Sequence, residues 1–282
     1  MRACFCLLLL ATAIGCGHQP LKTQNAKPKQ KTLKVMTFNV NFGIAGDLAT
    51  LKTIATSDAD VVLLQETTAP WQRAIANSLR KQYPYQSFRH CCGAGGLAVL
   101  SRFPFEDKQY VPAPKPGWFP AWRVVVDSPL GKVQMLNVHL RPPVSDEGSF
   151  VSGYFSTQAI RRKEIISHLK TLEPAMPTIV AGDFNENAKG DAVKALKDKQ
   201  LVSVLPQFHG DTHTWRWPTR FLTLRAQLDH IVYDRQRLKP LDAKVLRQGR
   251  SDHYPVVATF THQTPVGFAR AKRQDHSSLS MN

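Results

Sequence analysis

Short groups of Asn, Asp, Glu and His residues recur along this sequence of 282 residues, each at the start or the end of an apolar run. The groups are FNVN at 38–41, QE at 65–66, NVH at 137–139, GDFN at 182–185, LDH at 228–230 and SDH at 251–253. Loops at the ends of strands are where rigid scaffolds commonly carry chemistry. The recurrence of the same few residue types therefore predicts one polar site, assembled from positions far apart in the chain.

A carboxylate cluster of this kind requires a cation. The acidic residues of the groups are Glu66, Asp183, Asp229 and Asp252. If these carboxylates converge, each pair about 5 Å apart repels by roughly 3 kcal/mol at an effective dielectric near 20, and a few such pairs would offset the roughly 5–15 kcal/mol by which a domain is stable. Oxygen ligands from Glu, Asp and Asn suit magnesium, manganese or calcium better than zinc. We therefore expect Mg²⁺ at the site, with Mn²⁺ or Ca²⁺ as alternatives.

Each group taken alone has an ordinary structural interpretation. An isolated asparagine such as Asn39 would cap a turn, and an isolated Glu66 would be a solvated strand end. A lone His139 would be a hydrogen-bonded structural histidine, and Asp229 would pair with Arg225. These interpretations must all hold at once to account for the whole pattern, which weakens them against a shared site.

The apolar pattern indicates which elements position the polar groups. Strands are predicted at 33–41, 61–64, 97–100, 178–181, 228–233 and 254–260, with a hairpin formed by 122–126 and 133–139. Amphipathic helices are predicted at 47–56, 71–81, 156–172 and 191–198. Short, continuous apolar runs such as 61–64 are typical of strands covered on both faces. The sequence therefore predicts an α/β (α+β) protein of stacked sheets with helices outside, not a doubly wound parallel sheet.

The motifs also occur in the order that one known family shows. They are TFNVN, VVLLQE, GLAVLSRFP, NVHL, VAGDFN, QLDHIVY and SDHYPV, and they extend from about residue 34 to residue 260. On these motifs the sequence resembles the endonuclease/exonuclease/phosphatase superfamily, which includes pancreatic-type deoxyribonucleases, abasic-site endonucleases, neutral sphingomyelinases and inositol polyphosphate 5-phosphatases. The resemblance implies a deoxyribonuclease I-like, four-layer sandwich of two packed mixed β-sheets flanked by helices.

The resemblance implies a set of metal ligands. Glu66 matches the principal ligand of the divalent cation, with Asn39 and Asp252 nearby in the metal shell. Asn41 stands where some members of the family have aspartate, so its part in metal binding is left open.

The resemblance also implies catalytic roles for the remaining polar residues. Asp183 matches the residue that orients and deprotonates the attacking water, and Asn185 matches the one that holds a phosphate oxygen. His253 matches the histidine that donates to the phosphoryl group, with Asp229 as its orienting carboxylate. His139 matches a second histidine that contacts the phosphate or assists the leaving group. Together these residues would supply charge stabilisation, a nucleophile and help for the leaving oxygen, which phosphodiester hydrolysis requires.

The basic composition favours an anionic ligand. Net charge is +16 from 37 basic and 21 acidic residues, which suits nucleic acid, phospholipid headgroups or another phosphate ester. Aromatic and basic residues interleave at 118–123 and 215–225, where they would stack bases, lie on lipid headgroups or simply pack the rim of the sandwich. No long hydrophobic hairpin is evident, which disfavours a phospholipase. We therefore expect a monomeric phosphodiesterase acting on nucleic acid. A sphingomyelinase-like phospholipase or other phosphoesterase is the alternative, and a catalytically inactive anion-binding module is the third hypothesis.

Both ends of the chain differ in composition from the central residues, which we assign to one domain at 33–262. Residues 1–16 combine one arginine, an apolar run and small residues before Cys16, which is typical of a secretory signal. AIGC at 13–16 resembles a bacterial lipobox, with ordinary cleavage near Ala13 as the alternative. Residues 17–32 are expected to be a basic flexible tether and 263–282 a polar flexible tail. The protein is therefore expected outside the cytoplasm, either anchored to a membrane through a lipid on Cys16 or secreted.

After removal of the signal, Cys16, Cys91 and Cys92 remain, and a lipid on Cys16 leaves the pair Cys91 and Cys92. A disulfide between neighbouring cysteines closes a tight ring, so free or transiently oxidised thiols are expected. No cysteine spacing in the sequence suggests a zinc site.

Overall fold

The computed structural model describes residues 30–145, 148, 152–153, 156–210 and 212–264. The expected signal peptide lies outside the described residues, as do most of the tether and most of the tail. Within the described part of the chain, no helix is long and apolar enough to cross a membrane.

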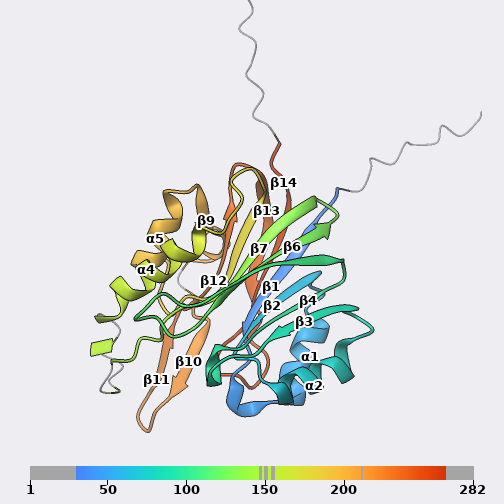
Figure 1. Cartoon of the computed structure of the whole chain (residues 1–282). Helices are drawn as coiled ribbons and strands as arrows, with labels where there is room; N and C mark the ends of the chain where they lie inside the picture. Colours follow the sequence, from blue (N-terminus) through green and yellow to red (C-terminus); the bar gives the residue numbers. More distant parts are fainter. Residues whose placement is uncertain (1–29, 146–147, 149–151, 154–155, 211, 265–282) are drawn as a thin grey trace, which may run out of the picture. The chain divides into compact units, whose positions relative to one another are not determined.

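Two six-stranded sheets form the centre of the fold (Figure 1). Sheet 1 has the strand order β13 (Leu238–Val245), β14 (Val256–His262), β1 (Leu33–Asn39), β2 (Val61–Gln65), β4 (Leu97–Ser101) and β3 (Tyr85–Arg89). Sheet 2 has the order β5 (Phe105–Val111), β6 (Ala121–Ser128), β7 (Gly131–His139), β8 (Thr178–Asp183), β12 (Asp229–Asp234) and β9 (Leu201–Ser203). A separate two-stranded hairpin consists of β10 (Trp215–Pro218) and β11 (Thr223–Ala226).

Both sheets are mixed, because each contains one parallel pair. β1 and β2 are parallel in sheet 1, and β7 and β8 are parallel in sheet 2. The other neighbouring strands pair antiparallel. Within each parallel pair, the two strands therefore have their carboxyl ends side by side. These carboxyl ends carry polar groups that the sequence analysis singled out.

The alternation of side chains along each central strand divides them between two hydrophobic cores. In β2, Val61 and Leu63 face the core between the sheets, whereas Val62 and Leu64 face the core under the outer helices. In β8, Ile179 and Val180 divide in the same way. Both faces of these strands are buried, which explains why the sequence shows continuous apolar runs rather than alternation.

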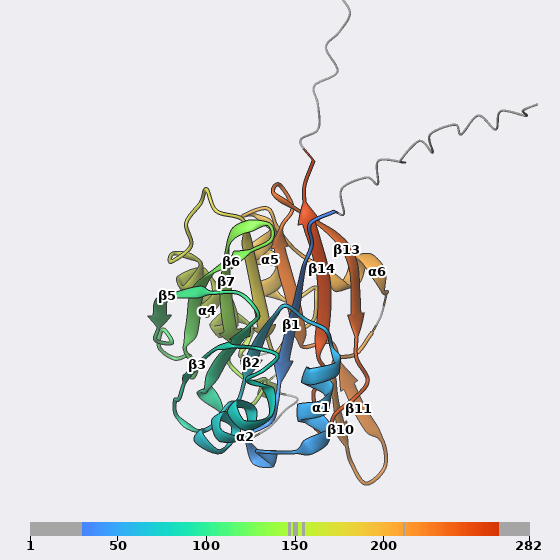
Figure 2. The same ribbon diagram turned by 90° about the vertical axis from the view of Figure 1, so that its right-hand side faces the viewer.

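Helices cover the outer faces of both sheets. α1 (Leu48–Thr56) and α2 (Ala69–Leu79) pack on sheet 1, and α4 (Gln158–Leu169) and α5 (Asp191–Lys197) pack on sheet 2. The views in Figures 1 and 2 show these pairs on opposite outer sides. A short helix, α6 (Leu205–Phe208), and the 3-10 turns η1 (Phe42–Ile44) and η2 (Gly93–Gly95) complete the described helices. The four-layer, deoxyribonuclease I-like sandwich predicted from the sequence is confirmed.

Local sequence signals determine where the helices of sheet 1 begin. The Asp47 side chain accepts a hydrogen bond from the Thr50 backbone N–H at 2.8 Å and caps α1. Thr68 caps α2, and Trp71 and Ile75 are buried one turn apart on its inner face. These caps place the ends of both helices close to the loops that follow β1 and β2.

The strands that the sequence analysis did not predict lie mostly at sheet edges. β5 is largely exposed and carries the run FEDKQYV, and β13 contains Pro240 and a register shift after it. Edge strands have a neighbouring strand on one side only and tolerate charges and proline, and most side chains of β5 and half of those of β13 are exposed, so their sequences need not be apolar. β3 and the β10–β11 hairpin are likewise partly exposed, whereas β9 has only three residues, too few for a recognisable pattern.

Of the expected states of Cys91 and Cys92, free or transiently oxidised thiols, the structure shows the oxidised one. The two sulfurs form a disulfide between neighbouring residues in the loop between β3 and β4. The loop turns tightly into η2 directly after Cys92. This turn brings both side chains to one side of the chain, which a sequence pattern does not reveal.

Candidate active site

The predicted polar groups meet at one rim of the sandwich because strand register brings them together. Asp183, the last residue of β8, pairs in register with His139 of parallel β7 and with Asp229 of antiparallel β12. Asn39 pairs in register with Gln65, so Glu66 follows directly beside it. The carboxyl ends of the parallel pairs thus supply most of the site.

The backbone at these strand ends has unusual conformations. Asn41, Glu66 and Asn185 have positive φ angles of 61°, 60° and 53°, which side-chain-bearing residues adopt uncommonly and mostly at functional sites or turns. Gly182 precedes Asp183, and an added Cβ there would lie 1.8 Å from the Val138 carbonyl oxygen. Glycine is therefore required for β7 and β8 to approach each other beside Asp183, which explains the GDFN pattern.

Asp183 is the hub of the site. Its Oδ2 atom lies 3.1 Å from Asn39 Nδ2 and 3.6 Å from the Nε2 atoms of both His139 and His253. Its Oδ1 atom accepts a hydrogen bond from the Asn185 backbone N–H at 2.9 Å. One amide nitrogen and two histidine rings, from three separate segments, thus surround a single carboxylate oxygen.

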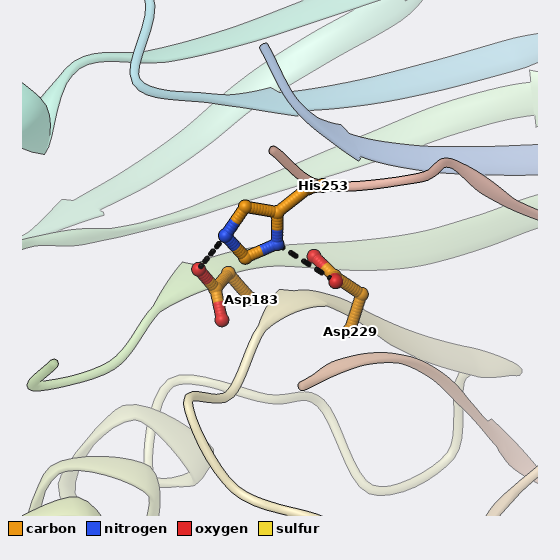
Figure 3. Close-up of side chains that lie close together, drawn as sticks. All are labelled: Asp183, Asp229 and His253. Carbon is orange, nitrogen blue, oxygen red and sulfur yellow. Dashed lines mark hydrogen bonds and ion pairs between the residues drawn. The ribbon is translucent and has the colours of Figure 1, made fainter. Parts of the chain in front are cut away.

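A carboxylate lies on each side of the His253 ring (Figure 3). Nδ1 donates to Asp229 Oδ2 at 2.9 Å, and Nε2 faces Asp183. Burial alone would lower the pKa of His253, but the negative charges of Asp229 and Asp183 and the hydrogen bond to Asp229 outweigh it and raise the pKa to about 10. His253 is therefore a cation at neutral pH.

The pKa of Asp183 is also raised, but here burial raises it and the neighbouring charge of His253 opposes the shift. Burial raises the pKa of Asp183 to about 6, against the lowering effect of His253. Asp183 is therefore mainly ionised at neutral pH but remains a better proton acceptor than an exposed aspartate, which suits a general base.

His139 is held in place as a neutral ring. Its Nδ1 lies 3.2 Å from the Ala94 carbonyl oxygen, which makes Nδ1 the donor, and Phe119 stacks on the ring with centroids 4.3 Å apart. Burial lowers the pKa of His139 below its ordinary value. Its Nε2 atom is thereby free of the ring proton and directed at the space beside Asp183.

Glu66 lies on the other side of Asn39. Asn39 Nδ2 donates to Glu66 Oε1 at 2.9 Å, and the Phe42 backbone N–H donates to Glu66 Oε2 at 3.0 Å. Burial raises the pKa of Glu66, and the nearby negative charge of Asp252 adds to the effect. The single amide nitrogen of Asn39 thus bridges the carboxylates of Glu66 and Asp183.

The last two predicted metal residues join the same cluster. Asn41 Nδ2 donates to Asp252 Oδ1 at 2.8 Å, and Trp215 Nε1 donates to Asp252 Oδ2 at 3.1 Å. The Asn41 backbone N–H donates to Asn39 Oδ1 at 3.1 Å. Asn39, Asn41, Glu66 and Asp252 are therefore linked through a short chain of hydrogen bonds.

Two groups in this rim have the chemistry to hold a cation. One is the compact set Asp183, Asp229 and His253, whose ligand atoms lie within 4.8 Å of one another. In that set, however, the protonated His253 already offsets one of the two carboxylate charges and occupies both carboxylates with its ring nitrogens. Glu66 and Asp252 have no comparable positive partner among the described residues, and their donors are oxygens that suit Mg²⁺. The Glu66 side of the rim fits the cation better.

Asn185 lies deeper than a simple phosphate ligand would. Its side-chain Nδ2 donates to the Leu140 carbonyl oxygen at 3.0 Å, and the residue is 5% exposed. It also lines an apolar cavity of about 450 Å³ beside Trp215. The structure places Asn185 next to the hub, with one amide hydrogen already committed to the backbone.

Several supporting residues had no role assigned from the sequence, although Asn137 and Gln65 belong to the groups NVH and QE. Asn137 Nδ2 donates across the two sheets to the carbonyl oxygens of Leu64 and Ala98, and Asn137 Oδ1 accepts from Gln65 Nε2 at 2.7 Å. Thr214 Oγ1 accepts from the backbone N–H of Asp229 at 3.0 Å. The only signal for Asn137 and Gln65 was their place as polar residues inside apolar runs.

The aromatic residues near the site are partly structural and partly exposed. Trp122 is fully buried and donates to Asp107, and Trp215 is 8% exposed. Trp217 is 51% exposed and stacks on Trp215, and Trp118 is 44% exposed with the Arg141 guanidinium 3.6 Å above its ring. Half of the predicted aromatic set thus packs the rim, and half remains available to a ligand.

The β10–β11 hairpin exposes apolar side chains at its tip. Phe221 is 87% exposed and Leu222 is 56% exposed. The sequence had suggested no long hydrophobic hairpin, and this one is indeed short, with strands of four residues each. A small apolar tip nevertheless exists beside the site.

Comparisons with known proteins agree with this geometry. The model of the endonuclease/exonuclease/phosphatase family matches residues 36–253. A comparison with curated proteins finds no match. Among solved structures, an endonuclease/exonuclease/phosphatase from Beutenbergia cavernae has a TM-score of 0.65 at 21% identity, covering 83% of this chain and 72% of that one.

Two further structures share the fold at low identity. TDP2 from C. elegans has a TM-score of 0.61 at 16% identity, covering 83% of this chain and 77% of that one. The catalytic domain of human nocturnin, solved with a bound sulfate anion, has a TM-score of 0.60 at 18% identity, covering 83% of this chain and 94% of that one.

Proposed function

Because the chain belongs to the endonuclease/exonuclease/phosphatase family, whose members generally cleave phosphoesters, we propose that it hydrolyses phosphodiester bonds with the help of a divalent cation. One observation carries the proposal: Asp183 Oδ2 is approached by Asn39, His139 and His253 together. This arrangement combines a general base with donors for a phosphoryl group, beside the carboxylates that suit a cation.

The residues of the hub have separate tasks in this reaction. Asp183 orients a water molecule and accepts its proton at the carboxylate as the water attacks phosphorus. The cationic His253 donates Nε2–H to a non-bridging phosphoryl oxygen and stabilises the charge that develops there. Asp229 holds the His253 ring in orientation and keeps it protonated. His139 directs its unprotonated Nε2 at the same space, where it accepts a hydrogen bond from the attacking water. The P–O bond to the leaving oxygen breaks as the water attacks, and a solvent water protonates that oxygen.

Glu66, Asn39 and Asp252 are the residues that would hold the cation, with Asn41 in support. Mg²⁺ is the ion that this donor set suits best, and Mn²⁺ or Ca²⁺ has the same oxygen preference. When bound, the ion supplies Lewis-acid stabilisation of the phosphate oxygens. In the protein alone, Asn39 donates from one nitrogen to both Glu66 and Asp183, which keeps these carboxylates aligned.

Nucleic acid is the substrate that we propose first. The net charge of +16 favours a polyanion over an isolated headgroup, and the exposed Trp217 offers a ring on which a base can stack. A phospholipid substrate is the second candidate, supported by the exposed Phe221 and Leu222 at the hairpin tip.

We also propose that the protein acts outside the cytoplasm as a monomer. The arginine and apolar run of residues 1–16 support export, and Cys16 supports attachment to a membrane through a lipid. Labelling cells with a fatty-acid analogue tests this: label on the wild type and none on Cys16→Ser supports the anchor. Equal label on both proteins, or none on either, would contradict it.

A substrate panel tests the proposed function. Purified protein is assayed on plasmid DNA, single-stranded RNA and sphingomyelin vesicles, with Mg²⁺ and with EDTA. We expect metal-dependent nicking of nucleic acid, lost in His253→Ala at unchanged circular dichroism and retained in His262→Ala, an exposed position. Cleavage of sphingomyelin alone would favour the phospholipase. Tight binding to the esters without hydrolysis of any would favour an inactive binding module.

A further inference from the structure

A second cavity adjoins the candidate active site. It has a volume of about 730 Å³ and lies between the β10–β11 hairpin and the loop that leads into β14. Asn41 and Asp252 of the site form part of its wall. We call it the arginine cavity, because Arg216, Arg225, Arg247 and Arg250 line it.

Four arginines and one carboxylate, that of Asp252, line the arginine cavity, so most of its positive charge is uncompensated. Arg250 has a carboxylate near it, Asp47 Oδ2 at 3.8 Å. Arg216, Arg225 and Arg247 make no ion pair with any carboxylate among the residues that the structure describes. Burial and the charges of these arginines lower the pKa of His213, which also lines the cavity. A site of this composition is prepared for an anion.

Two of the four arginines, Arg216 and Arg247, are positioned by contacts with neighbouring rings. The guanidinium groups of Arg216 and Arg247 lie 4.6 and 5.9 Å from the centre of the Tyr254 ring. Arg247 Nη1 also donates to His213 Nε2 at 2.7 Å. Such contacts reduce the entropy that the side chains lose when they bind a ligand.

The arginine cavity is tied directly to the catalytic residues. The Arg216 backbone N–H donates to the Asp252 carbonyl oxygen at 2.9 Å, and Trp215 forms a backbone bridge with His253. Asp252, His253 and Tyr254 are consecutive, so the chain passes from the cation-binding side through the hub to the cavity within three residues. A ligand group in the cavity therefore lies next to the proposed position of the scissile phosphate.

We propose that the arginine cavity binds the phosphate next to the scissile linkage in a nucleic acid strand, an inference that rests on the proposed function. Guanidinium groups bind phosphate through paired, charge-assisted hydrogen bonds, and a strand carries a phosphate at every nucleotide. A phospholipid with a single phosphodiester would leave the cavity empty. The exposed face of Trp217, on the cavity wall, accepts the base between the two phosphates.

A comparison of substrates that differ by one phosphate tests the proposal. The thymidine dinucleotide with one phosphodiester is compared with the same dinucleotide carrying a terminal phosphate at its 5′ or its 3′ end. We expect the terminal phosphate to raise kcat/KM at least tenfold at one of the two ends. Arg225→Gln and Arg247→Gln should reduce that gain to less than threefold, whereas Arg80→Gln, an exposed change in another part of the surface, should preserve it.

Binding in EDTA separates this proposal from the proposed function. The phosphorylated dinucleotide should bind the metal-free protein at least tenfold more tightly than the unphosphorylated one, and Arg225→Gln should abolish the difference. If this holds while no ester is hydrolysed, the proposed function fails and the arginine cavity stands. If hydrolysis is normal but the terminal phosphate changes neither binding nor kcat/KM, or the arginine variants keep the gain, the cavity proposal is overturned.

Discussion

The two sheets of the sandwich are built on the same plan but end in different chemistry. In sheet 1 the parallel pair β1 and β2 is flanked by antiparallel β14 and β4. In sheet 2 the parallel pair β8 and β7 is flanked by antiparallel β12 and β6. In each sheet, the same arrangement of strands therefore brings polar residues together at the carboxyl ends of the parallel pair.

The difference lies in which residues stand at that edge. Sheet 1 ends in Asn39 and Glu66, a set of amide and carboxylate groups that suits a cation. Sheet 2 ends in Asp183, with His139 and Asp229 as its register partners, a set that moves protons. His253 enters from the loop before β14 and joins the second set. The difference supports the proposal that sheet 1 supplies the residues for a cation and sheet 2 those for proton transfer.

The largest effect is expected at the hub of sheet 2. Asp183→Asn removes the proton acceptor while preserving shape, so kcat should fall by about 10³- to 10⁴-fold. Because this loss concerns proton transfer, raising the metal concentration should not restore it. Steady-state kinetics over a range of Mg²⁺ concentrations measure both quantities, and recovery of kcat at high Mg²⁺ would place Asp183 on the cation side instead.

Asp229→Asn should have the next largest effect. The change removes the charge that keeps His253 protonated, and we expect kcat to fall by about 10²-fold with KM little changed. The alkaline limb of the pH–rate profile should also move to lower pH, because His253 then loses its proton more easily. A profile that keeps the wild-type position would show that Asp229 has only a structural role.

Glu66→Gln tests sheet 1 in the same way. Losing a carboxylate of the cation side should raise the Mg²⁺ concentration for half-maximal activity by at least about tenfold, with much of kcat recovered at saturation. EDTA should abolish activity in the wild type and in this variant. An unchanged metal requirement would mean that the cation is held elsewhere.

A smaller effect, on stability, is expected from loss of the hydrogen bonds that Asn137 forms between the two sheets. Asn137→Leu removes the hydrogen bonds to the carbonyl oxygens of Leu64 and Ala98 and the one from Gln65. Because these groups are buried, the free energy of unfolding should fall by about 2–3 kcal/mol, as measured by urea denaturation. A loss below about 1 kcal/mol would mean that the two halves of the site are aligned by apolar packing alone.

The two helix layers differ in their buried titratable side chains, and this difference should make the stability of the protein depend on pH. α4 over sheet 2 buries His168, whose ring nitrogens have no partner among the described residues, whereas α1 and α2 bury no titratable side chain. Burial lowers the pKa of His168 to about 4, below the value of about 6.5 in an unfolded chain. The unfolded chain therefore binds the extra proton between these values, and stability present above about pH 6.5 is lost as the pH falls toward 4.

His168→Leu should reduce this acid sensitivity. Between pH 7 and pH 5 the variant should lose about 2 kcal/mol less unfolding free energy than the wild type. Urea denaturation at both pH values measures the difference, and His262→Leu, at an exposed position, serves as the control. Equal losses in wild type and His168→Leu would show that the buried ring is not the source.

The sequence predicted the parts of the fold that are buried on both faces. β2 and β8 are apolar throughout because both of their faces meet a core, and such runs are visible without a structure. β5 and β13 were invisible because an edge strand with one exposed face tolerates charges and proline. The disulfide between Cys91 and Cys92 depends on a local turn that no spacing rule describes.

The sequence indicated which residues belong to the site, but not which of them contact one another. Asp183 and Glu66 were singled out because they interrupt or end apolar runs, and the structure places both beside Asn39. The bond from Asn137 to the other sheet depends on how the two sheets face each other, which a single sequence does not encode locally. The arginine cavity likewise joins residues from the hairpin and the loop before β14, and only the tertiary fold brings them together.

The position of the bound cation tests the division between the two sheets most directly. Crystals grown with Mn²⁺ in place of Mg²⁺ locate the ion through its anomalous scattering. We predict a peak at bonding distance from the Glu66 carboxylate, with His253 still hydrogen-bonded to Asp229. A single peak enclosed by Asp183, Asp229 and His253, with Glu66 free of it, would contradict the account.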